Sequence, residues 1–344
     1  MKAAVLVDKM KMEIQELPVP TPADFEVVVN VKACGICGTD QHIYHGQPGS
    51  AEVQFPIVLG HELAGEVVKV GSKVSSLKPG DRVSIDPNMY CGECEYCRGG
   101  RPHLCEDLQA IGVTRNGGMG EYCAVPSANC YLLPDKLSYE EGAMIEPLGC
   151  VLHGVNQINF WPGASVLIIG GGYIGLMMLQ MAKMYGTNAT VSEPDQKKHA
   201  FARELGADNT LTPGELGQGD RPLVPAQGGY DIVIECVGRK DSMTQAIQMA
   251  RKGGSVLLFG VSAPDTKIEI NPYEIFSKEL TIKGSFINPH THEQAIALVE
   301  QGKIQIKPLL SHSFTMEELP EIMDQYPKLN VVKGIVVSRF SRSQ

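Results

Sequence analysis

Four cysteines within 15 residues form the densest group of potential metal ligands in the sequence. They follow the pattern C-x2-C-x2-C-x7-C and are Cys91, Cys94, Cys97 and Cys105. This spacing lets a short loop surround one tetrahedral ion, and four thiolates leave that ion no open coordination position. Because the first residues show no secretory signal, we favour metal-bound thiolates over disulfide-paired or merely buried cysteines. The pattern predicts a structural zinc site.

A second group of potential ligands is spread along the first half of the chain. It comprises Cys37, His61, Glu62 and Glu146. Taken alone, a histidine that follows an apolar segment, as His61 does, is more often a hydrogen-bonded core residue than a ligand. Cys34 and Cys37 also fit a redox C-x-x-C motif, but the surrounding sequence does not predict the βαβ unit of a thioredoxin-like fold. The spacing of this group by itself leaves its role open.

A glycine-rich motif stands where an apolar strand would meet a helix. The run Ser165–Ile169 leads into G-x-G-x-x-G, which includes Gly170, Gly172, Tyr173, Ile174 and Gly175. The first glycine permits a tight turn, the second lets the backbone approach a pyrophosphate, and the third allows close helix–strand packing. The helix N-terminus offers free N–H groups to the phosphates. We predict that this motif binds a dinucleotide.

Glu193 supports this prediction and indicates which dinucleotide is bound. It ends the second strand, 18 residues after Gly175, where a carboxylate accepts hydrogen bonds from the adenosine ribose. A carboxylate there would repel a 2′-phosphate, and Pro194 follows at a position where an arginine would suit NADP. We therefore expect NAD rather than NADP. Lys197 and Lys198 could reach a phosphate, but a solvated first helical turn explains them more simply.

The elements that must position these residues show two patterns. Residues 1–150 contain short β-branched runs between Pro and Gly turns, which indicates a compact, loop-rich β domain. Residues 151–288 alternate strands and helices, which predicts a parallel, doubly wound sheet. Its expected strands are Ser165–Gly170, Ala189–Glu193, Asn209–Thr212, Tyr230–Gly238, Ser255–Val261 and Leu280–Phe286. Because six strands already precede residues 289–344, we expect this tail to return to the first domain.

Composition excludes several classes of function. The chain has 344 residues, of which 43% are hydrophobic and 20% charged, and its formal net charge is −9. The 30 Lys and Arg residues are dispersed, so neither a nucleic acid nor an anionic membrane is an expected partner. The longest apolar runs are strand-sized, far short of the ~20 residues that cross a bilayer. We expect a cytoplasmic protein with a small-molecule substrate.

The order of the motifs resembles that of zinc-dependent medium-chain dehydrogenases over essentially the whole chain. The matching segments are Gly35–Asp40, Gly60–Glu62, Cys91–Cys105, Gly117–Tyr122, Glu146–Leu148 and Gly170–Gly175. A Glu-Pro-Leu segment in place of a third ligand cysteine is similar to the polyol branch, with its sorbitol, xylitol and sugar-alcohol-phosphate dehydrogenases. The resemblance implies an α/β fold with a Rossmann-type sheet and a GroES-like β catalytic domain, and assembly as a homodimer or homotetramer.

The resemblance also implies a second Zn²⁺ in each subunit, the catalytic one. Cys37 and His61 would hold it together with one carboxylate, Glu62 or Glu146, and one position would stay open. Because a carboxylate is a harder ligand than a thiolate, Mn²⁺ could replace zinc here. Family members differ in which carboxylate binds. Since the residue before Pro147 should be extended, we expect Glu146 at the metal or within one water of it.

The implied reaction is NAD-linked oxidation of a secondary alcohol of a polyol or polyol phosphate to a ketose, or its reverse. Thr39 and His42 match the family's proton-relay positions, so Thr39 would take the alcohol proton and His42 would release it to solvent; the alternative for His42 is a surface imidazole in a helical turn. Ile287-Asn288 replaces an arginine of sorbitol dehydrogenases, which argues against free sorbitol. Arg115 could receive a phosphate or be a solvated turn residue.

Two alternative functions remain at this stage. The same architecture could act on a simple alcohol, butanediol or threonine. A non-catalytic dinucleotide-binding sensor could also keep this fold, but the intact second group of ligands argues against it.

Overall fold

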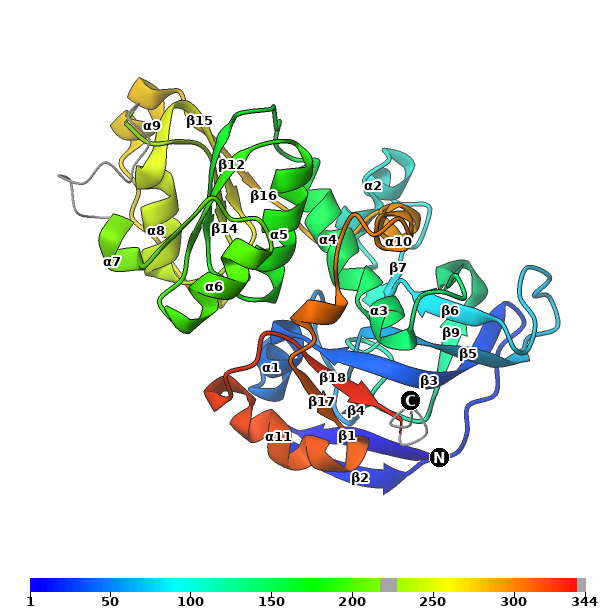
Figure 1. Cartoon of the computed structure of the whole chain (residues 1–344). Helices are drawn as coiled ribbons and strands as arrows, with labels where there is room; N and C mark the ends of the chain where they lie inside the picture. The colour runs from blue at the N-terminus through cyan, green and yellow to red at the C-terminus, as the bar shows by residue number, and fades with distance from the viewer. Residues whose placement is uncertain (217–227, 339–344) are drawn as a thin grey trace. The chain divides into compact units, whose positions relative to one another are not determined.

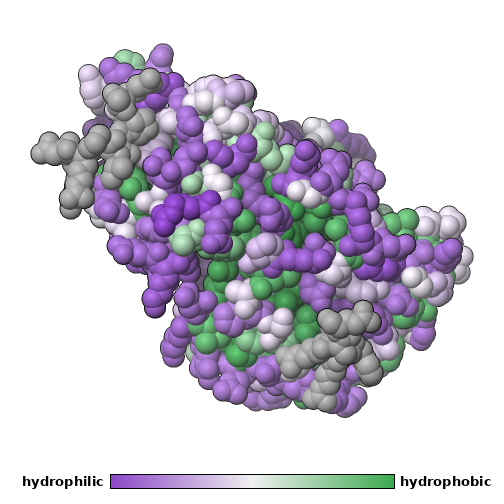
Figure 2. Space-filling view, viewed as in Figure 1, coloured by the Kyte–Doolittle hydropathy of each residue, from purple (hydrophilic) through white to green (hydrophobic). Residues whose placement is uncertain are grey.

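The computed structural model describes residues 1–216 and 228–338, which form two compact units (Figure 1). The first unit contains residues 1–149 and the chain from Ile287 onward, and the second contains Cys150–Phe286. Hydrophilic side chains cover most of the face seen in Figure 2. No helix in the described parts is long and apolar enough to cross a membrane.

A seven-stranded sheet is the centre of the first unit. It is built from β3 (Glu26–Ile36), β5 (Glu62–Val70), β6 (Arg82–Ile85), β9 (Tyr122–Pro126), β10 (Cys130–Leu132), β17 (His312–Phe314) and β18 (Gly334–Val337). The order is β10-β6-β5-β3-β18-β17, with β9 also pairing with β3. The Val-rich sequence of β3 is buried almost along its whole length, so this strand anchors the core.

Short elements and loops surround that sheet. Two small sheets consist of β1 (Lys2–Asp8), β2 (Lys11–Glu16) and β4 (Ile57–Val58), and of β7 (Asn88–Met89) and β8 (Gln109–Ala110). The helices are α1 (Gly38–Tyr44), α2 (Glu95–Arg98), α3 (Tyr139–Ala143), α10 (His292–Glu300) and α11 (Leu319–Gln325). The expected loop-rich β domain is confirmed.

Strand pairing brings distant segments of the first unit together. In the antiparallel β3–β5 ladder, Gly35 is opposite Glu62. On the other side of β3, Gly334 of β18 is opposite Ile36. The residue after β3, the start of β5 and the residue before β18 are therefore neighbours, and these are the positions of Cys37, Glu62 and Lys333.

The second unit is a doubly wound parallel sheet, as the sequence predicts. Its strands are β11 (Ser165–Ile169), β12 (Asn188–Ser192), β13 (Asn209–Leu211), β14 (Tyr230–Glu235), β15 (Ala250–Leu258) and β16 (Thr281–Gly284). Its helices are α5 (Tyr173–Met184), α6 (Lys197–Glu204), α7 (Pro213–Leu216), α8 (Lys240–Met249) and α9 (Pro272–Lys278). The order β13-β12-β11-β14-β15-β16 reverses direction between β11 and β14. Ligands of such sheets bind at the carboxyl ends of the strands beside this reversal.

Helix α4 (Ile145–Val155) corrects one expectation about Glu146. The sequence predicts an extended backbone before Pro147, but both residues lie in the first turn of this helix. A proline is tolerated there because the first N–H groups of a helix have no partner within it. Glu146 is therefore presented by a helix.

Candidate active site and nucleotide-binding turn

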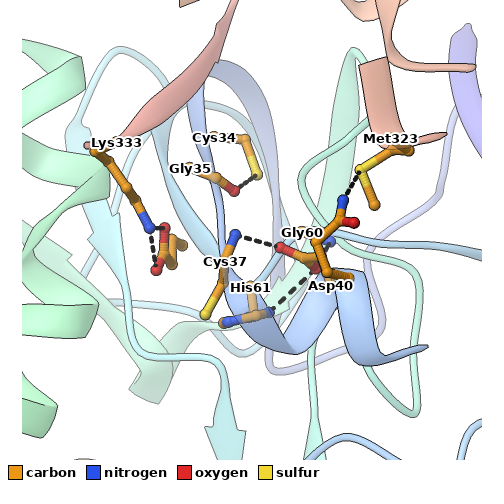
Figure 3. A network of polar contacts seen from close by, with 10 residues as sticks. Cys34, Gly35, Cys37, Asp40, Gly60, His61, Met323 and Lys333 are labelled. Carbon is orange, nitrogen blue, oxygen red and sulfur yellow. Dashed lines mark hydrogen bonds and ion pairs between the residues drawn. The ribbon is translucent and has the colours of Figure 1, made fainter. Parts of the chain in front are cut away.

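Three side chains of the first unit converge where β3 ends and β5 begins. Two of them, Cys37 and His61, are labelled in Figure 3. One ligand atom from each of Cys37, His61 and Glu62 lies within 4.8 Å of the other two. His61 and Glu62 are only 7% and 1% exposed. Gly60 makes the turn before His61 with a φ of +96°, and a side chain there would meet the Cys34 sulfur. A thiolate, an imidazole and a carboxylate form a donor set that suits Zn²⁺ and leaves a fourth position open.

Asp40 holds two of the segments that carry these ligands. Its fully buried carboxylate accepts hydrogen bonds from the backbone N–H groups of Cys37 at 2.8 Å and Gly60 at 3.3 Å. One of its oxygens lies 3.4 Å from Nδ1 of His61. Burial lowers the pKa of His61, but Asp40 and Cys37 outweigh it and raise that pKa well above its ordinary value. With Nδ1 turned toward Asp40, Nε2 of His61 is the ring nitrogen that would face a metal.

The sequence motifs assign no role to Asp40, although a local signal exists. Asp40 is the third residue of α1, and its carboxylate caps Cys37, the residue before that helix. A carboxylate three residues after a ligand cysteine at a helix start indicates such a cap. The contact with His61 depends on the strand pairing and has no local signal.

Lys333 brings a buried positive charge to the same place. It is 5% exposed, and its Nζ lies 2.7 Å from Oε1 and 2.5 Å from Oε2 of Glu62. Burial lowers the pKa of Lys333, but Glu62 and Cys37 raise it more, so the ammonium group remains charged. Both oxygens of Glu62 therefore contact Lys333. The sequence does not predict this pair because 271 positions separate its members.

The other predicted catalytic residues lie in the first unit but outside the three-residue group. Glu146 is 6% exposed in the first turn of α4. Thr39 and His42 are half-buried and three residues apart, which places them on one face of α1. Burial and the neighbouring His45 lower the pKa of His42. Its ring is therefore neutral at pH 7 and able to accept a proton.

Two residues considered for substrate choice have partners within the first unit. Arg115 donates a hydrogen bond from Nη2 to Oε1 of Glu26 at 2.6 Å, so its charge is paired. Asn288 is fully buried; its side-chain oxygen accepts from Asn88 at 2.6 Å, and its amide donates to Asp86 at 3.4 Å. The polar groups of both residues are therefore already bonded to other side chains of the protein.

The four cysteines of the predicted structural site also converge. The sulfur atoms of Cys91, Cys94, Cys97 and Cys105 all lie within 4.8 Å of one another. Backbone N–H groups of Cys91 and Cys94 donate to the sulfurs of Cys105 and Cys91 at 3.3 and 3.4 Å, which favours thiolates. All ten cysteines of the chain are free thiols, so no disulfide competes with metal binding.

In the second unit, the glycine-rich motif joins β11 to α5. Gly170 has a φ of +106°, and a Cβ on Gly175 would lie 1.8 Å from the Gly170 carbonyl oxygen. Open space lies beside Gly172, as the approach of a pyrophosphate requires. Tyr173 is buried and Ile174 half-buried, and they are the first two residues of α5.

Glu193 directly follows β12 and faces this motif. Its Oε2 accepts a hydrogen bond from the backbone N–H of Gly171 at 2.8 Å, and its Oε1 accepts one from Asp195 at 3.0 Å. The residue is 9% exposed. The predicted ribose-binding carboxylate is thus held against the turn that would bind the pyrophosphate.

Two family models match this chain. The model described as alcohol dehydrogenase GroES-like domain matches residues 23–135, and the model described as zinc-binding dehydrogenase matches residues 174–301.

Known proteins are similar over almost the full length. D-arabinitol dehydrogenase 1 of Uromyces fabae is 34% identical over 90% of this chain and 88% of its own. A Sinorhizobium meliloti protein described as a zinc-binding dehydrogenase, solved bound to NADP, has a TM-score of 0.93 and 38% identity over 98% of this chain and 99% of its own. Galactitol-1-phosphate dehydrogenase of Escherichia coli has a TM-score of 0.89 and 27% identity over 98% of this chain and 100% of its own.

Proposed function

Because the chain belongs to the zinc-binding dehydrogenases, we propose that it oxidises a secondary alcohol of a polyol to a ketose, or catalyses the reverse, with NAD as hydride carrier. The observation that carries the proposal is the convergence of Cys37 and His61 with a carboxylate, a donor set that leaves one coordination position for a substrate oxygen. The names of an arabinitol and a galactitol phosphate dehydrogenase among its relatives support a polyol.

The donor sets fit two Zn²⁺ ions, one in each ligand group. At the catalytic site Cys37 and His61 would hold the ion, which when bound supplies the Lewis acidity that lowers the pKa of the alcohol. Lys333 engages both oxygens of Glu62. This contact favours Glu146 as the carboxylate that completes the set, directly or through one water, with Glu62 exchanging with it or acting behind the ligands. The carboxylate also makes Mn²⁺ acceptable at this site.

Thr39 and His42 would move the proton that the alcohol loses. The Thr39 hydroxyl accepts it and passes it along the same face of α1 to His42. The lowered pKa of His42 leaves a ring nitrogen unprotonated at pH 7. The imidazole then releases the proton to solvent.

Glu193 supports NAD over NADP because its carboxylate would accept hydrogen bonds from the ribose hydroxyls and would repel a 2′-phosphate. Arg115, paired with Glu26, gives little positive potential for a substrate phosphate. We therefore favour an unphosphorylated polyol. Thiolate ligands at both metal sites suit a reducing compartment, which supports a cytoplasmic location.

The second unit also supports assembly of the chain with a second copy. Strand β16 ends the sheet, and its residues are mostly exposed. Helix α9 beside β15 exposes Tyr273 at 70% and Phe276 at 76%. An open sheet edge beside exposed aromatic side chains is typical of an interface. Light scattering should give the mass of a dimer or tetramer, and Phe276→Glu should reduce it.

One panel of assays tests the proposed reaction. Zinc-loaded protein is incubated with NAD and arabinitol, xylitol, sorbitol, their phosphate esters, butanediol or threonine, and NADH is measured. We expect the highest kcat/KM with an unphosphorylated polyol other than sorbitol. Turnover of butanediol or threonine alone would contradict the proposed substrate class, and turnover of none would support a sensor.

A further inference from the structure

Four hydrogen bonds hold Glu193 in place. Its N–H donates to the Leu211 carbonyl at 2.8 Å, and its carboxylate accepts from Gly171 and Asp195. Its own carbonyl oxygen lies 2.7 Å from Nε2 of His199. Of these four bonds, only the last comes from another residue's side chain. The position of Glu193 therefore depends on which residue stands at position 199, and a single substitution there can remove the bond.

His199 is built into the fold as a donor. It is the third residue of α6 and is 8% exposed, whereas Lys197 beside it faces solvent. A carbonyl oxygen only accepts hydrogen bonds, so Nε2 carries a proton and donates. An apolar side chain at this position would leave the Glu193 carbonyl without that bond.

We propose that His199 is a positioning residue that fixes Glu193 and thereby sets the preference for NAD over NADP. The inference rests on the proposed cofactor. Glu193 discriminates only while its carboxylate stays beside the ribose 2′ position. Gly171 holds that carboxylate on the side of the glycine motif, and His199 holds the backbone on the side of α6.

Loss of the His199 bond would let the turn after β12 relax. The carboxylate would then hydrogen-bond the ribose of NAD less often. It would also repel the 2′-phosphate of NADP less strongly. The fold as such does not decide the choice of cofactor, because a structure with a TM-score of 0.93 to this chain holds NADP. The preference for one cofactor must therefore come from residues near the ribose site. Glu193 is the best placed of these, and His199 positions it.

The test measures Kd for NADH and for NADPH by fluorescence titration of zinc-loaded wild type, His199→Leu and His199→Gln. Leucine removes the donor at similar volume, whereas glutamine places an amide N–H near the position of Nε2. We expect His199→Leu to bind NADH roughly tenfold more weakly and NADPH little changed, and His199→Gln to keep most of the preference. Should His199→Leu not fold, His199→Asn, whose amide is too short to replace Nε2, takes its place.

Two comparisons separate positioning from general stability. Ile247→Ala, which opens a cavity at a buried position of α8, should lower Tm and leave the NADH:NADPH ratio unchanged. In a Glu193→Ala background, His199→Leu should not change the ratio further, because the carboxylate that it positions is gone.

The possible failures are distinguishable. The inference is overturned if His199→Leu keeps the wild-type NADH:NADPH ratio of Kd values. It is also overturned if His199→Leu changes that ratio equally in the wild-type and Glu193→Ala backgrounds. Either result leaves the proposed function intact. A wild type that binds neither nucleotide overturns the proposed cofactor, and the inference with it. Failure to oxidise any polyol would overturn the proposed substrate without affecting the binding ratio.

Discussion

The two metal-ligand groups of this chain differ in how they are assembled. The four-cysteine group comes from one loop of 15 residues, and three of its four members are half-buried. The group of Cys37, His61 and Glu62 comes from the ends of two paired strands, and two of its members are almost fully buried. Two buried charged residues, Asp40 and Lys333, contact members of the second group.

This difference indicates a division of labour. A closed set of four thiolates needs little help from the rest of the fold, and it contributes folding energy where the loop would otherwise lack a core. An open set with three donors has to be oriented and charge-balanced by residues outside it. Substitutions should therefore affect stability at the first site, and chemistry or buried charge at the second.

The largest effect is expected from a ligand of the open group. Cys37→Ala should lower kcat by at least about a thousandfold, because the Lewis acid that stabilises the alkoxide is lost. Metal analysis should show one zinc per chain in place of two, and Tm should change little. Normal turnover with a single zinc would show that this group is not the catalytic site.

Lys333 tests whether the open group depends on buried charge. Lys333→Met leaves the Glu62 carboxylate buried without its partner, which should lower the free energy of unfolding by about 3–5 kcal/mol. Lys333→Met with Glu62→Gln should recover much of this loss, since both charges are gone. Lys307→Met is the control, because its ion pair with Glu141 involves a lysine side chain that is 68% exposed. Equal losses in the two single variants, measured by urea unfolding, would contradict this account.

Glu146→Ala asks which carboxylate completes the open group. We expect kcat to fall about a hundredfold, as when one preorganised group at a reacting centre is removed, with Kd for NADH nearly unchanged. Glu146→Gln should keep the fold and lose the rate. If both variants retain zinc and turnover, the carboxylate ligand is Glu62 alone.

The sequence predicts features formed within one segment of the chain better than features formed between distant segments. The cysteine loop and the glycine motif lie within single segments, so their spacing predicts both sites. Asp40 has a local capping signal but an unpredictable contact with His61. Lys333 reaches Glu62, and Glu26 reaches Arg115, only through tertiary packing over 271 and 89 positions. At Glu146 a local signal gives the wrong prediction. A residue before proline prefers an extended backbone, but Glu146 lies in the first turn of a helix.

The closed group should respond mainly through stability. Cys97→Ser weakens a tetrathiolate without touching the open group, so Tm should fall by about 5 °C or the subunits should separate. The folded fraction should keep its kcat and its preference for NAD. Full zinc content with an unchanged Tm would show that these thiols do not hold a structural ion.

The smallest effect concerns the proton path beside the open group. Burial and His45 lower the pKa of His42, so the neutral, proton-accepting form persists below the ordinary histidine pKa of about 6.5. The acidic limb of kcat/KM for polyol oxidation should therefore lie below that value, with activity present above the limb and lost as pH falls through it. His45→Gln removes the smaller of the two causes, so the limb should move partly back toward 6.5. His42→Gln should abolish the limb, and a limb that stays in place in that variant would assign it to another group.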